Sequence, residues 1–234
     1  SAKVFHDTLV AFAERRIITM EIDDLNLGMI KEKYPLLEIF KDKNSYIVSG
    51  KFILNHCFED VRMTGKFELQ ICVPTDFPLS LPKVKEMSHY IDRNYPYIYQ
   101  NGQFCLASDL ELKMFFSQNA DICAFIDKYV IPYLYTYRFY EEYGVYPYGE
   151  RSHGIMGDLE YLKDLFEVDD WGQVLNIILF VAQSPYRGHL SCPCGSGKRI
   201  RNCHGDILKR VINAGLQTDC KKVLLEIKET MKER

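Results

Sequence analysis

The sequence has no long hydrophobic run and no strong excess of charge of either sign. Its longest apolar stretch, Val174–Ala182, is interrupted by Asn176 and is far shorter than the roughly 20 residues that a membrane-spanning helix needs. The first residues, Ser1–Asp7, mix charged and apolar side chains and lack the apolar centre of a secretory signal. We therefore expect a cytoplasmic protein with no membrane partner.

The formal net charge is only −3 over 234 residues. This balance argues against non-specific binding of nucleic acid by the whole chain. The charge is uneven, because the segment from Lys198 onward has ten Lys or Arg against five Asp or Glu, which gives +5 there and −8 elsewhere. This basic segment fits a solvated helix face or a surface for an acidic partner. Nucleic-acid binding through it is the weakest of the functions considered.

The hydrophobic pattern predicts a helix followed by an antiparallel sheet. Apolar residues at helical spacing run from Ala2 to about Met20, and a turn-rich patch follows around Asp23–Gly28. Residues 59–65 hold a turn or continue a neighbouring strand. Four β-rich segments predict a four-stranded antiparallel meander: Leu37–Lys41, Tyr46–Leu54, Lys66–Val73 and Lys83–Met87. Three prolines predict an extended loop before the last strand: Pro74, Pro78 and Pro82.

Helices predominate after the sheet. A long helix is expected from Asn119 to Tyr143, and Pro132 should kink or split it. Residues 144–149 contain the glycines and the proline of a linker. Four further helices are predicted at 158–166, 170–183, 206–214 and 218–231. Because 47% of the residues are hydrophobic, the chain can build one substantial core and a smaller unit. The predicted antiparallel sheet followed by helices gives an α+β fold class.

Eight cysteines are present. In a cytoplasmic protein they serve as metal ligands, nucleophiles or core residues more often than in disulfides. The contexts of Cys105 and of a group that begins at Cys192 point to chemistry. The other four are predicted to pack as small apolar side chains: Cys57, Cys72, Cys123 and Cys220.

Cys105 lies in a segment with the composition of a loop. Gly102 allows the backbone to turn, Asn94 and Asn101 favour loop conformations, and Leu106 is expected to anchor the loop to the core. A thiolate is a good nucleophile and a good leaving group, so an exposed Cys105 suits the carriage of an acyl group as a thioester. The spacing alone also fits a cysteine that is packed inside a loop. No charged residue adjoins Cys105, so the sequence gives no sign of a lowered thiol pKa.

The sequence around Cys105 resembles the core of ubiquitin-conjugating enzymes. Pro74-Thr75-Asp76-Phe77-Pro78, followed by Pro82-Lys83-Val84, is similar to the family's proline loop. Tyr95-Pro96-Tyr97 stands at the place of the family's His-Pro-Asn. Gly102-Gln103-Phe104-Cys105-Leu106 matches the segment around the family's cysteine. The resemblance covers roughly residues 1–143. It implies the ubiquitin-conjugating-enzyme-like fold, with an N-terminal helix, a four-stranded antiparallel meander and C-terminal helices.

The resemblance also implies an activity. Cys105 would accept the C-terminal carboxylate of a ubiquitin-like protein, or a similar tail, from a separate activating enzyme and pass it to an amine. The first helix, with Arg15 and Arg16, would lie where the family docks that activating enzyme. Bacterial relatives occur in anti-phage operons beside cGAS-like nucleotidyltransferases and are thought to join the C-terminus of the nucleotidyltransferase to targets. The divergent loop and the added C-terminal segment look more like those relatives than like a eukaryotic enzyme.

The chain departs from the family at two positions beside the cysteine. Tyr97 replaces the asparagine that is thought to stabilise the oxyanion, and loss of an oxyanion donor typically costs about a hundred- to a thousandfold in rate. The Tyr97 hydroxyl or the side chain of Asn101 could substitute. Otherwise transfer to lysine would be slow and the thioester long-lived. Tyr95 replaces the family histidine. His89 and His153 are weaker candidates for helpers, and His153 also fits an ordinary surface histidine.

The most specific local motif is a cysteine and histidine cluster near the C-terminus. The run from Cys192 to Gly205 holds three thiols and one imidazole: Cys192, Cys194, Cys203 and His204. This set suits tetrahedral zinc, and the absence of a fifth ligand favours a structural ion over a catalytic one. Gly195, Ser196 and Gly197 permit the tight turn of a small knuckle. A Cys192–Cys194 disulfide or free thiols are the alternatives.

The same run resembles the SEC-C motif, which is known from the end of the SecA translocation motor and from many unrelated bacterial proteins. The resemblance implies a structural zinc that presents a binding surface. The predicted organisation is a ubiquitin-conjugating-like domain over 1–148, a helical connector over 149–190 and the zinc knuckle with C-terminal helices over 191–234. The main rival to a thioester-forming enzyme is a catalytically silent protein-binding module with a zinc adaptor. The loss of the asparagine favours the rival, and the retained Gly-x-Phe-Cys-Leu opposes it.

Overall fold

The computed structural model describes residues 27–149, 152 and 154–232. The helix expected over 2–20, with Arg15 and Arg16, lies outside the described residues, and so does His153. The chain divides into two compact units. The first comprises residues 1–106 and 120–144, and the second comprises residues 107–119 and 145–234.

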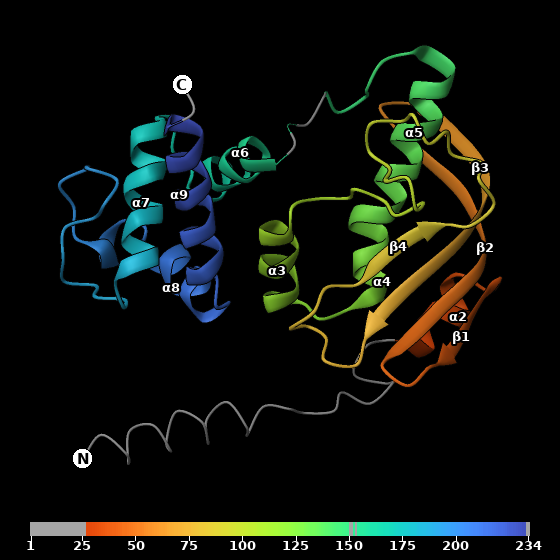
Figure 1. Ribbon diagram of the computed structural model, residues 1–234, viewed down its shortest axis with the longest axis horizontal. Coiled ribbons are helices and arrows are strands. Elements are labelled where there is room, and N and C mark those ends of the chain that lie inside the picture. Colours follow the sequence, from red (N-terminus) through yellow and green to blue (C-terminus); the bar gives the residue numbers. More distant parts are fainter. Residues whose placement is uncertain (1–26, 150–151, 153, 233–234) are drawn as a thin grey trace. The chain divides into compact units, whose positions relative to one another are not determined.

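The first unit is built on a four-stranded antiparallel sheet (Figure 1). Its strands pair in sequence order, which confirms the predicted meander: β1 (Leu37–Lys41), β2 (Ser45–Phe58), β3 (Val61–Pro74) and β4 (Lys83–Glu86). Residues 75–82 form the loop that the prolines predict between the last two strands. The segment that the sequence left open is a continuation of both strands, because Phe58 pairs with Val61 across a two-residue turn.

That turn consists of Glu59 and Asp60, which both have positive φ angles, 45° and 66°. Two central residues in this region match the primed turns whose twist suits a tight hairpin. The long β2–β3 hairpin therefore places alternate residues on one face, where Phe52, Leu54 and Phe67 are buried. This face is the apolar core of the sheet.

A long broken helix covers the apolar face of the sheet (Figure 1). It runs through α4 (Ile122–Phe125), a π-helical segment (Ile126–Val130) and α5 (Ile131–Tyr143). The irregular segment lies directly before Pro132, which has no N–H to continue the regular pattern. The expected interruption at Pro132 is thus confirmed. The helix ends at Gly144, which has a φ of 72° and caps it in the left-handed conformation.

A short helix, α2 (Leu27–Lys33), precedes the sheet. Residues 23–26 of the turn that the sequence predicts lie outside the described residues, and its last two, Leu27 and Gly28, are helical. The two buried residues of α2, Leu27 and Ile30, are three apart and face the core together. The burial of Leu27 and Ile30 in the core stabilises this short helix, and the sequence of seven residues does not reveal that burial.

The second unit is helical, and its described helices share one core. Its elements are α3 (Asp109–Gln118), α6 (Gly154–Phe166), α7 (Trp171–Gln183), the 3-10 helix η3 (Ile200–Asn202), α8 (Gly205–Asn213) and α9 (Gln217–Lys232). The four helices predicted beyond residue 150 are confirmed. The core joins the helical connector to the cysteine segment, because Val174, Cys192 and Leu208 all belong to it.

Helix α3 was not expected. Ser108 caps its N-terminus by accepting from the Glu111 amide at 3.2 Å. Leu110 and Met114 lie in the core of the second unit, and Lys113 forms an ion pair of 2.6 Å with Asp219. Residues 107–119 thus pack with the C-terminal helices, although they interrupt the first unit in the sequence.

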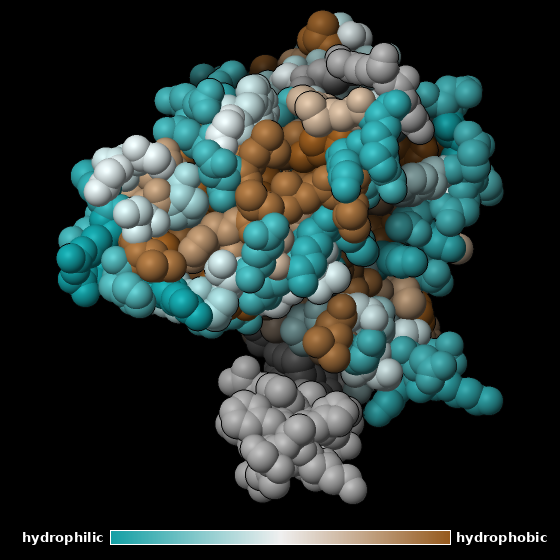
Figure 2. All heavy atoms as spheres, turned by 60° about the vertical axis from the view of Figure 1, so that its left-hand side comes forward, coloured by the Kyte–Doolittle hydropathy of each residue, from teal (hydrophilic) through white to brown (hydrophobic). Residues whose placement is uncertain are grey.

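Some large apolar side chains remain at the surface. Figure 2 shows one face of the molecule, where hydrophobic side chains gather into a patch bordered by hydrophilic ones. Exposed apolar side chains are ordinary in folded proteins, so they do not by themselves identify a site. Across residues 27–149, 152 and 154–232, none of the helices combines the length and the apolar character needed to cross a membrane.

Candidate functional site

Cys105 has no regular secondary structure, as the loop prediction expects, and it directly follows the isolated antiparallel bridge between Ile98 and Phe104, which closes a small hairpin-like loop. Its amide donates to the Tyr97 carbonyl at 2.8 Å, and the Tyr99 amide donates to the Gln103 carbonyl at 2.8 Å. The turn closes through Gly102, whose amide donates to the Tyr99 carbonyl at 2.8 Å. Residues 97–105 therefore fold back on themselves, and the bridge between Ile98 and Phe104 brings Tyr97 opposite Cys105.

The hairpin continues the main sheet beyond β4. The Phe104 amide donates to the Val84 carbonyl at 2.9 Å, and Lys85 and Gln103 form an antiparallel bridge. Ile98 and Phe104, which form a bridge within the hairpin, are both buried. Since side chains alternate between the faces of a strand, their neighbours project to the other face.

Phe104 anchors the hairpin to the core of the first unit. Its side chain is only 4% exposed, and its ring stacks on Tyr133 of α5 with centroids 4.2 Å apart. The Tyr133 hydroxyl donates to the Tyr97 carbonyl at 2.8 Å. Leu106, expected as the anchor, is only partly buried. The alternation places Phe104, and not the cysteine, against the core.

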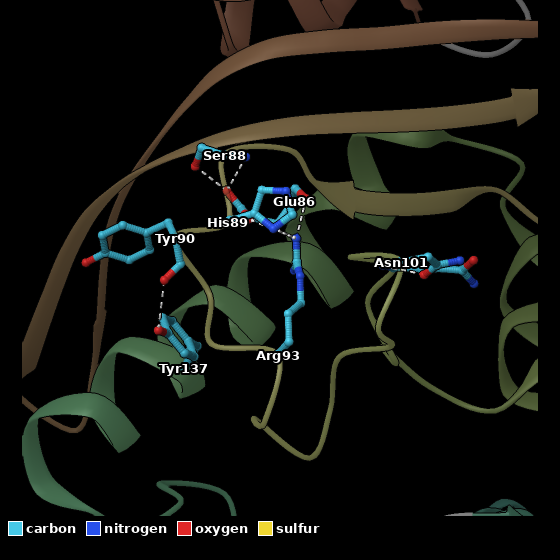
Figure 3. Close-up of polar contacts among 8 residues, drawn as sticks. Glu86, Ser88, His89, Tyr90, Arg93, Asn101 and Tyr137 are labelled. Atoms are coloured by element: carbon cyan, nitrogen blue, oxygen red, sulfur yellow. Dashed lines mark hydrogen bonds and ion pairs between the residues drawn. The ribbon is translucent and has the colours of Figure 1, made fainter.

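The turn of the hairpin depends on Gly102 and Asn101. Gly102 has a φ of 81°, as its expected role in the turn requires, and an added Cβ would lie 2.8 Å from the Glu86 carbonyl oxygen. The Asn101 side-chain oxygen accepts from the Gln103 amide at 3.0 Å (Figure 3). This bond gives Asn101 a structural role in the turn, and its role in catalysis stays a prediction.

A buried polar cluster lies beside this turn (Figure 3). The side chain of Glu86 is fully buried and accepts from the Ser88 amide at 2.8 Å, while Arg93 lies 3.7 Å from its second carboxylate oxygen. Arg93 also donates to the Glu86 carbonyl at 3.3 Å and to Nδ1 of His89 at 3.2 Å. A guanidinium only donates, so this contact occupies the acceptor nitrogen of His89. Gly102 packs on Arg93, because an added Cβ would lie 2.9 Å from its Nη2.

The thiol of Cys105 is half-buried, and burial raises its pKa above the ordinary value. A hydrogen bond from the Tyr99 side chain opposes this increase in the pKa. Tyr99 itself is 55% exposed. The sequence predicts Tyr97 and Asn101 beside Cys105 but does not predict Tyr99 there. Tyr99 is two residues from Tyr97, and residues two apart in an extended segment project to the same side. This spacing is the sequence signal that could have revealed Tyr99.

Tyr97 is tied to Cys105 through its main chain. Its carbonyl oxygen accepts both the Cys105 amide and the Tyr133 hydroxyl. Its own ring lies 5.5 Å from the ring of Tyr95. The structure therefore brings together Cys105, Tyr97 and the turn at Asn101, while the action of the Tyr97 hydroxyl on an oxyanion stays a prediction.

The predicted metal ligands converge in the second unit. One donor atom from each of four residues lies within 4.8 Å of all the others: Cys192, Cys194, Cys203 and His204. The sulfurs of Cys194 and Cys203 are 3.6 Å apart, and Nδ1 of His204 lies 3.2 Å from the sulfur of Cys192 and 3.3 Å from that of Cys203. A tetrahedral site with zinc–sulfur bonds of about 2.3 Å needs sulfurs about 3.8 Å apart. The cluster could therefore hold a metal ion such as zinc.

Neighbouring groups fix the orientation of these ligands. The Nε2 atom of His204 lies 2.8 Å from the Phe166 carbonyl at the end of α6, so Nε2 carries the proton and Nδ1 is left to bind metal. Gly195 and Gly197 turn the loop with φ angles of 78° and 72°, as the motif predicts. Gln173 of α7 donates to the Cys194 carbonyl at 3.0 Å.

The surroundings act in opposite directions on two of the thiols: burial raises the pKa of Cys192 to about 11, whereas the pKa of Cys194 is shifted toward the charged form that binds metal. Burial raises the pKa of Cys194, but hydrogen bonds from Ser196 and interactions with the neighbouring thiols outweigh it, and the pKa is lowered to about 6. A thiolate is the form that ligates zinc. The four residues thus fit a metal ion in position and in chemistry.

All eight cysteines are free of disulfides. Cys123 and Cys220 are buried, as predicted, and Cys72 is partly buried. The prediction was wrong for Cys57, which is exposed. On β2 the neighbouring positions Phe52 and Leu54 face the core, and Cys57 lies an odd number of residues away and projects to the opposite face.

Comparison of the chain with protein-family models, with curated proteins and with solved structures finds no match.

Proposed function

We propose that Cys105 carries an acyl group as a thioester and transfers it to an amine, as a ubiquitin-conjugating-like transferase does. The main support is the placement of the thiol. Cys105 lies on the hairpin face opposite the buried Phe104, it is half-buried rather than sealed, and its sulfur is within hydrogen-bond reach of Tyr99. A nucleophile needs this combination of a fixed backbone and an accessible side chain.

The proposed reaction has two steps at the same sulfur. The Cys105 thiolate attacks an activated carboxyl carbon, a C–S bond forms, and the activating group leaves with the electron pair of its own bond. An amine then attacks the thioester carbon, a C–N bond forms, the C–S pair returns to sulfur, and the amine loses a proton to solvent. The raised pKa of Cys105 makes its thiolate a poorer leaving group, so the thioester would wait for its acceptor.

The proposed partners follow from the resemblance to ubiquitin-conjugating enzymes. The donor is the C-terminus of a ubiquitin-like protein or of a cGAS-like nucleotidyltransferase, delivered by a separate activating enzyme. The setting is bacterial anti-phage defence in the cytoplasm. The exposed side of the hairpin, with Tyr97, Tyr99 and Gln103 around the thiol, is where an incoming tail would lie.

We further propose that the four-residue cluster holds a structural zinc ion. Cys192, Cys194, Cys203 and His204 supply four ligands and so complete a tetrahedral shell. When bound, the ion would cross-link the segment from Cys192 to His204 and would have no open coordination position for a substrate. The chain's own residues orient the ligands, and the ordered unit would recruit or position a partner.

The rival function is a protein-binding module without catalysis. It is favoured by Tyr97, which stands where the family has its asparagine, and by the raised pKa of the Cys105 thiol. It keeps the fold and the zinc site but predicts no covalent adduct on Cys105.

A thiol-sensitive gel shift separates the two functions. The full-length protein is incubated with ATP and a lysate of its native host and is run with and without reducing thiol. The wild type should give a larger, thiol-labile band, Cys105→Ser a thiol-stable band, and Cys105→Ala none. Cys57→Ala is the matched control, because this cysteine is exposed and lies elsewhere in the same unit. An adduct that persists in Cys105→Ala, or no adduct in any variant, contradicts the proposal.

A further inference from the structure

The face of the hairpin that carries Cys105 also carries three polar side chains. Because Ile98 and Phe104 project into the core, the residues that alternate with them project to the other face: Tyr97, Tyr99, Gln103 and Cys105. Tyr97 is the direct partner of Cys105, and Tyr99 pairs with Gln103. Tyr99 is therefore the diagonal cross-strand neighbour of Cys105.

A diagonal pair across antiparallel strands lies within reach of an aromatic side chain. The Tyr99 side chain reaches the thiol, where its hydrogen bond lowers the pKa of Cys105 against the effect of burial. Tyr99 is 55% exposed, so the contact lies at the solvent-facing surface, where an acyl donor or an amine can approach. The phenol donates and the sulfur accepts, since a negatively charged sulfur has no proton to give.

The backbone holds this pair in place on both strands. Tyr99 is bonded through its amide to Gln103 and through its carbonyl to Gly102, each at 2.8 Å, and Cys105 is bonded through its amide to Tyr97. The buried neighbour Phe104 is stacked on Tyr133. Main-chain hydrogen bonds therefore hold the backbones of Tyr99 and Cys105 in a fixed register.

Other titratable and charged groups surround the hairpin. Tyr133 of α5 donates its hydroxyl to the Tyr97 carbonyl, and Arg93 bonds Glu86 and His89. Tyr95 and Tyr97 contribute rings from the turn that precedes Ile98, and Lys85 comes from β4, where it forms a bridge with Gln103. Tyr99 is the side chain whose hydrogen bond acts on the Cys105 thiol.

We propose that Tyr99 is a catalytic residue of the Cys105 site, whose hydroxyl donates a hydrogen bond to the sulfur whenever the sulfur carries negative charge. This happens before acylation, when the thiolate is the nucleophile, and again when the C–S bond of the thioester breaks and its electron pair returns to sulfur. The phenol keeps its proton in both steps. The second step rests on the proposed function, whereas the hydrogen bond to the free thiolate does not.

The expected effect follows from the strength of a hydrogen bond to a charged acceptor. Such a bond shifts the ionisation of the acceptor by about one pKa unit, which corresponds to about a tenfold change in the thiolate fraction near neutral pH. Tyr99→Phe keeps the ring and removes the donor. Tyr143→Phe is the matched control, because Tyr143 is 51% exposed on α5 of the same unit and lies in neither the hairpin nor the zinc site.

The test measures alkylation of Cys105 by iodoacetamide in the full-length, zinc-loaded protein. The rate is followed from about pH 7 to about pH 11.5 by mass spectrometry of the peptide that contains Cys105, because the midpoint of a raised thiol pKa lies in the upper part of this range. Tyr99→Phe should move the midpoint of the rate profile up by about one pH unit and slow alkylation about tenfold at pH 7, while Tyr143→Phe should match the wild type. A loss of packing alone would expose the thiol and speed alkylation. A Tyr99→Phe profile that coincides with the wild type overturns the proposal.

A second measurement separates this inference from the proposed function. The thiol-labile adduct is isolated and discharged with free lysine, and Tyr99→Phe should discharge more slowly than the wild type. If the alkylation midpoint moves but no thioester forms on Cys105, the hydrogen bond is supported and the proposed function fails. If the thioester forms and the Tyr99→Phe protein shows neither a moved midpoint nor slower discharge, the role of Tyr99 fails alone.

Discussion

The Tyr133 hydroxyl donates to the main-chain carbonyl of Tyr97 at 2.8 Å, and this bond ties α5 to the hairpin that carries Cys105. The same carbonyl oxygen accepts the amide of Cys105 at 2.8 Å. One oxygen therefore connects the helix to both strands of the hairpin. The position of the thiol is determined by a helix that begins more than twenty residues later in the sequence.

Removal of this hydroxyl should loosen the hairpin. Tyr133→Phe is expected to lower the free energy of unfolding by about 1 kcal/mol, because one buried donor is lost, and to speed hydrogen exchange at the Cys105 amide. Tyr135→Phe is the matched control. Its hydroxyl donates to the Val61 carbonyl at 3.1 Å from the same helix, so it should cost similar stability without changing exchange at Cys105. Equal exchange at Cys105 in both variants would show that Tyr133 does not hold the hairpin.

The turn of the hairpin should not tolerate a side chain at Gly102. Gly102→Ala places a Cβ 2.8 Å from the Glu86 carbonyl oxygen in a left-handed backbone conformation, and we expect a loss of about 3 kcal/mol in the free energy of unfolding. Gly144→Ala shares the left-handed backbone, at a φ of 72°, but meets no atom within 4 Å. It should cost only about 1 kcal/mol. Urea unfolding measures both, and equal losses would refute the steric argument.

Much of the sheet could be predicted from the sequence because its signals are local. Alternating apolar residues mark Lys66–Val73, and the prolines after it can only lie in a loop. Helix α3 was missed because its apolar residues, Leu110 and Met114, pack on helices that come later in the chain. Ser108 and Glu111 do form the spacing of a capping box, which is the one local signal that could have located this helix.

The sequence predicts the metal cluster more completely than the surroundings of Cys105. The four metal ligands follow from residue type and spacing, since a knuckle brings near neighbours together. The bond from His204 to the Phe166 carbonyl joins residues 38 apart, so the sequence does not show it. Tyr99 was missed because its contact with Cys105 depends on the register of the hairpin, and a one-residue shift would place Tyr99 on the other face.

Loss of one metal ligand should unfold part of the second unit. Cys203→Ala is expected to reduce the zinc content of the purified protein from about one ion per chain to none and to lower its helix content, because metal binding and folding are coupled. Cys220→Ala is the matched control, since Cys220 is buried in the same core but is not in the cluster. It should keep zinc and lose about 1 kcal/mol in the free energy of unfolding. Zinc retained by Cys203→Ala would contradict the site.

The half-buried carboxyl of Asp158 in the second unit should make stability depend on pH. Burial raises the pKa of Asp158, and a hydrogen bond from Ser108 offsets only part of this change. A raised folded-state pKa means that the stability contribution is fully present below the unfolded pKa of about 3.9 and is lost as pH rises through the folded value. Asp158→Asn cannot ionise, so at pH 7 it should be more stable than the wild type, and this advantage should vanish near pH 4.

Thermal unfolding across this pH range checks the prediction for Asp158. Asp164→Asn is the control, because Asp164 is exposed on the same helix, α6. An Asp158→Asn advantage that is independent of pH would point to packing and not to ionisation.

The most direct test of the account is mass spectrometry of Cys105→Ser protein expressed in its native host. Serine turns a labile thioester into an ester that survives purification. We predict that the peptide containing position 105 carries a covalent C-terminal tail of another protein, and that the tail identifies the donor. An unmodified peptide at position 105, with wild-type protein also free of any thiol-labile adduct, would contradict acyl transfer through Cys105.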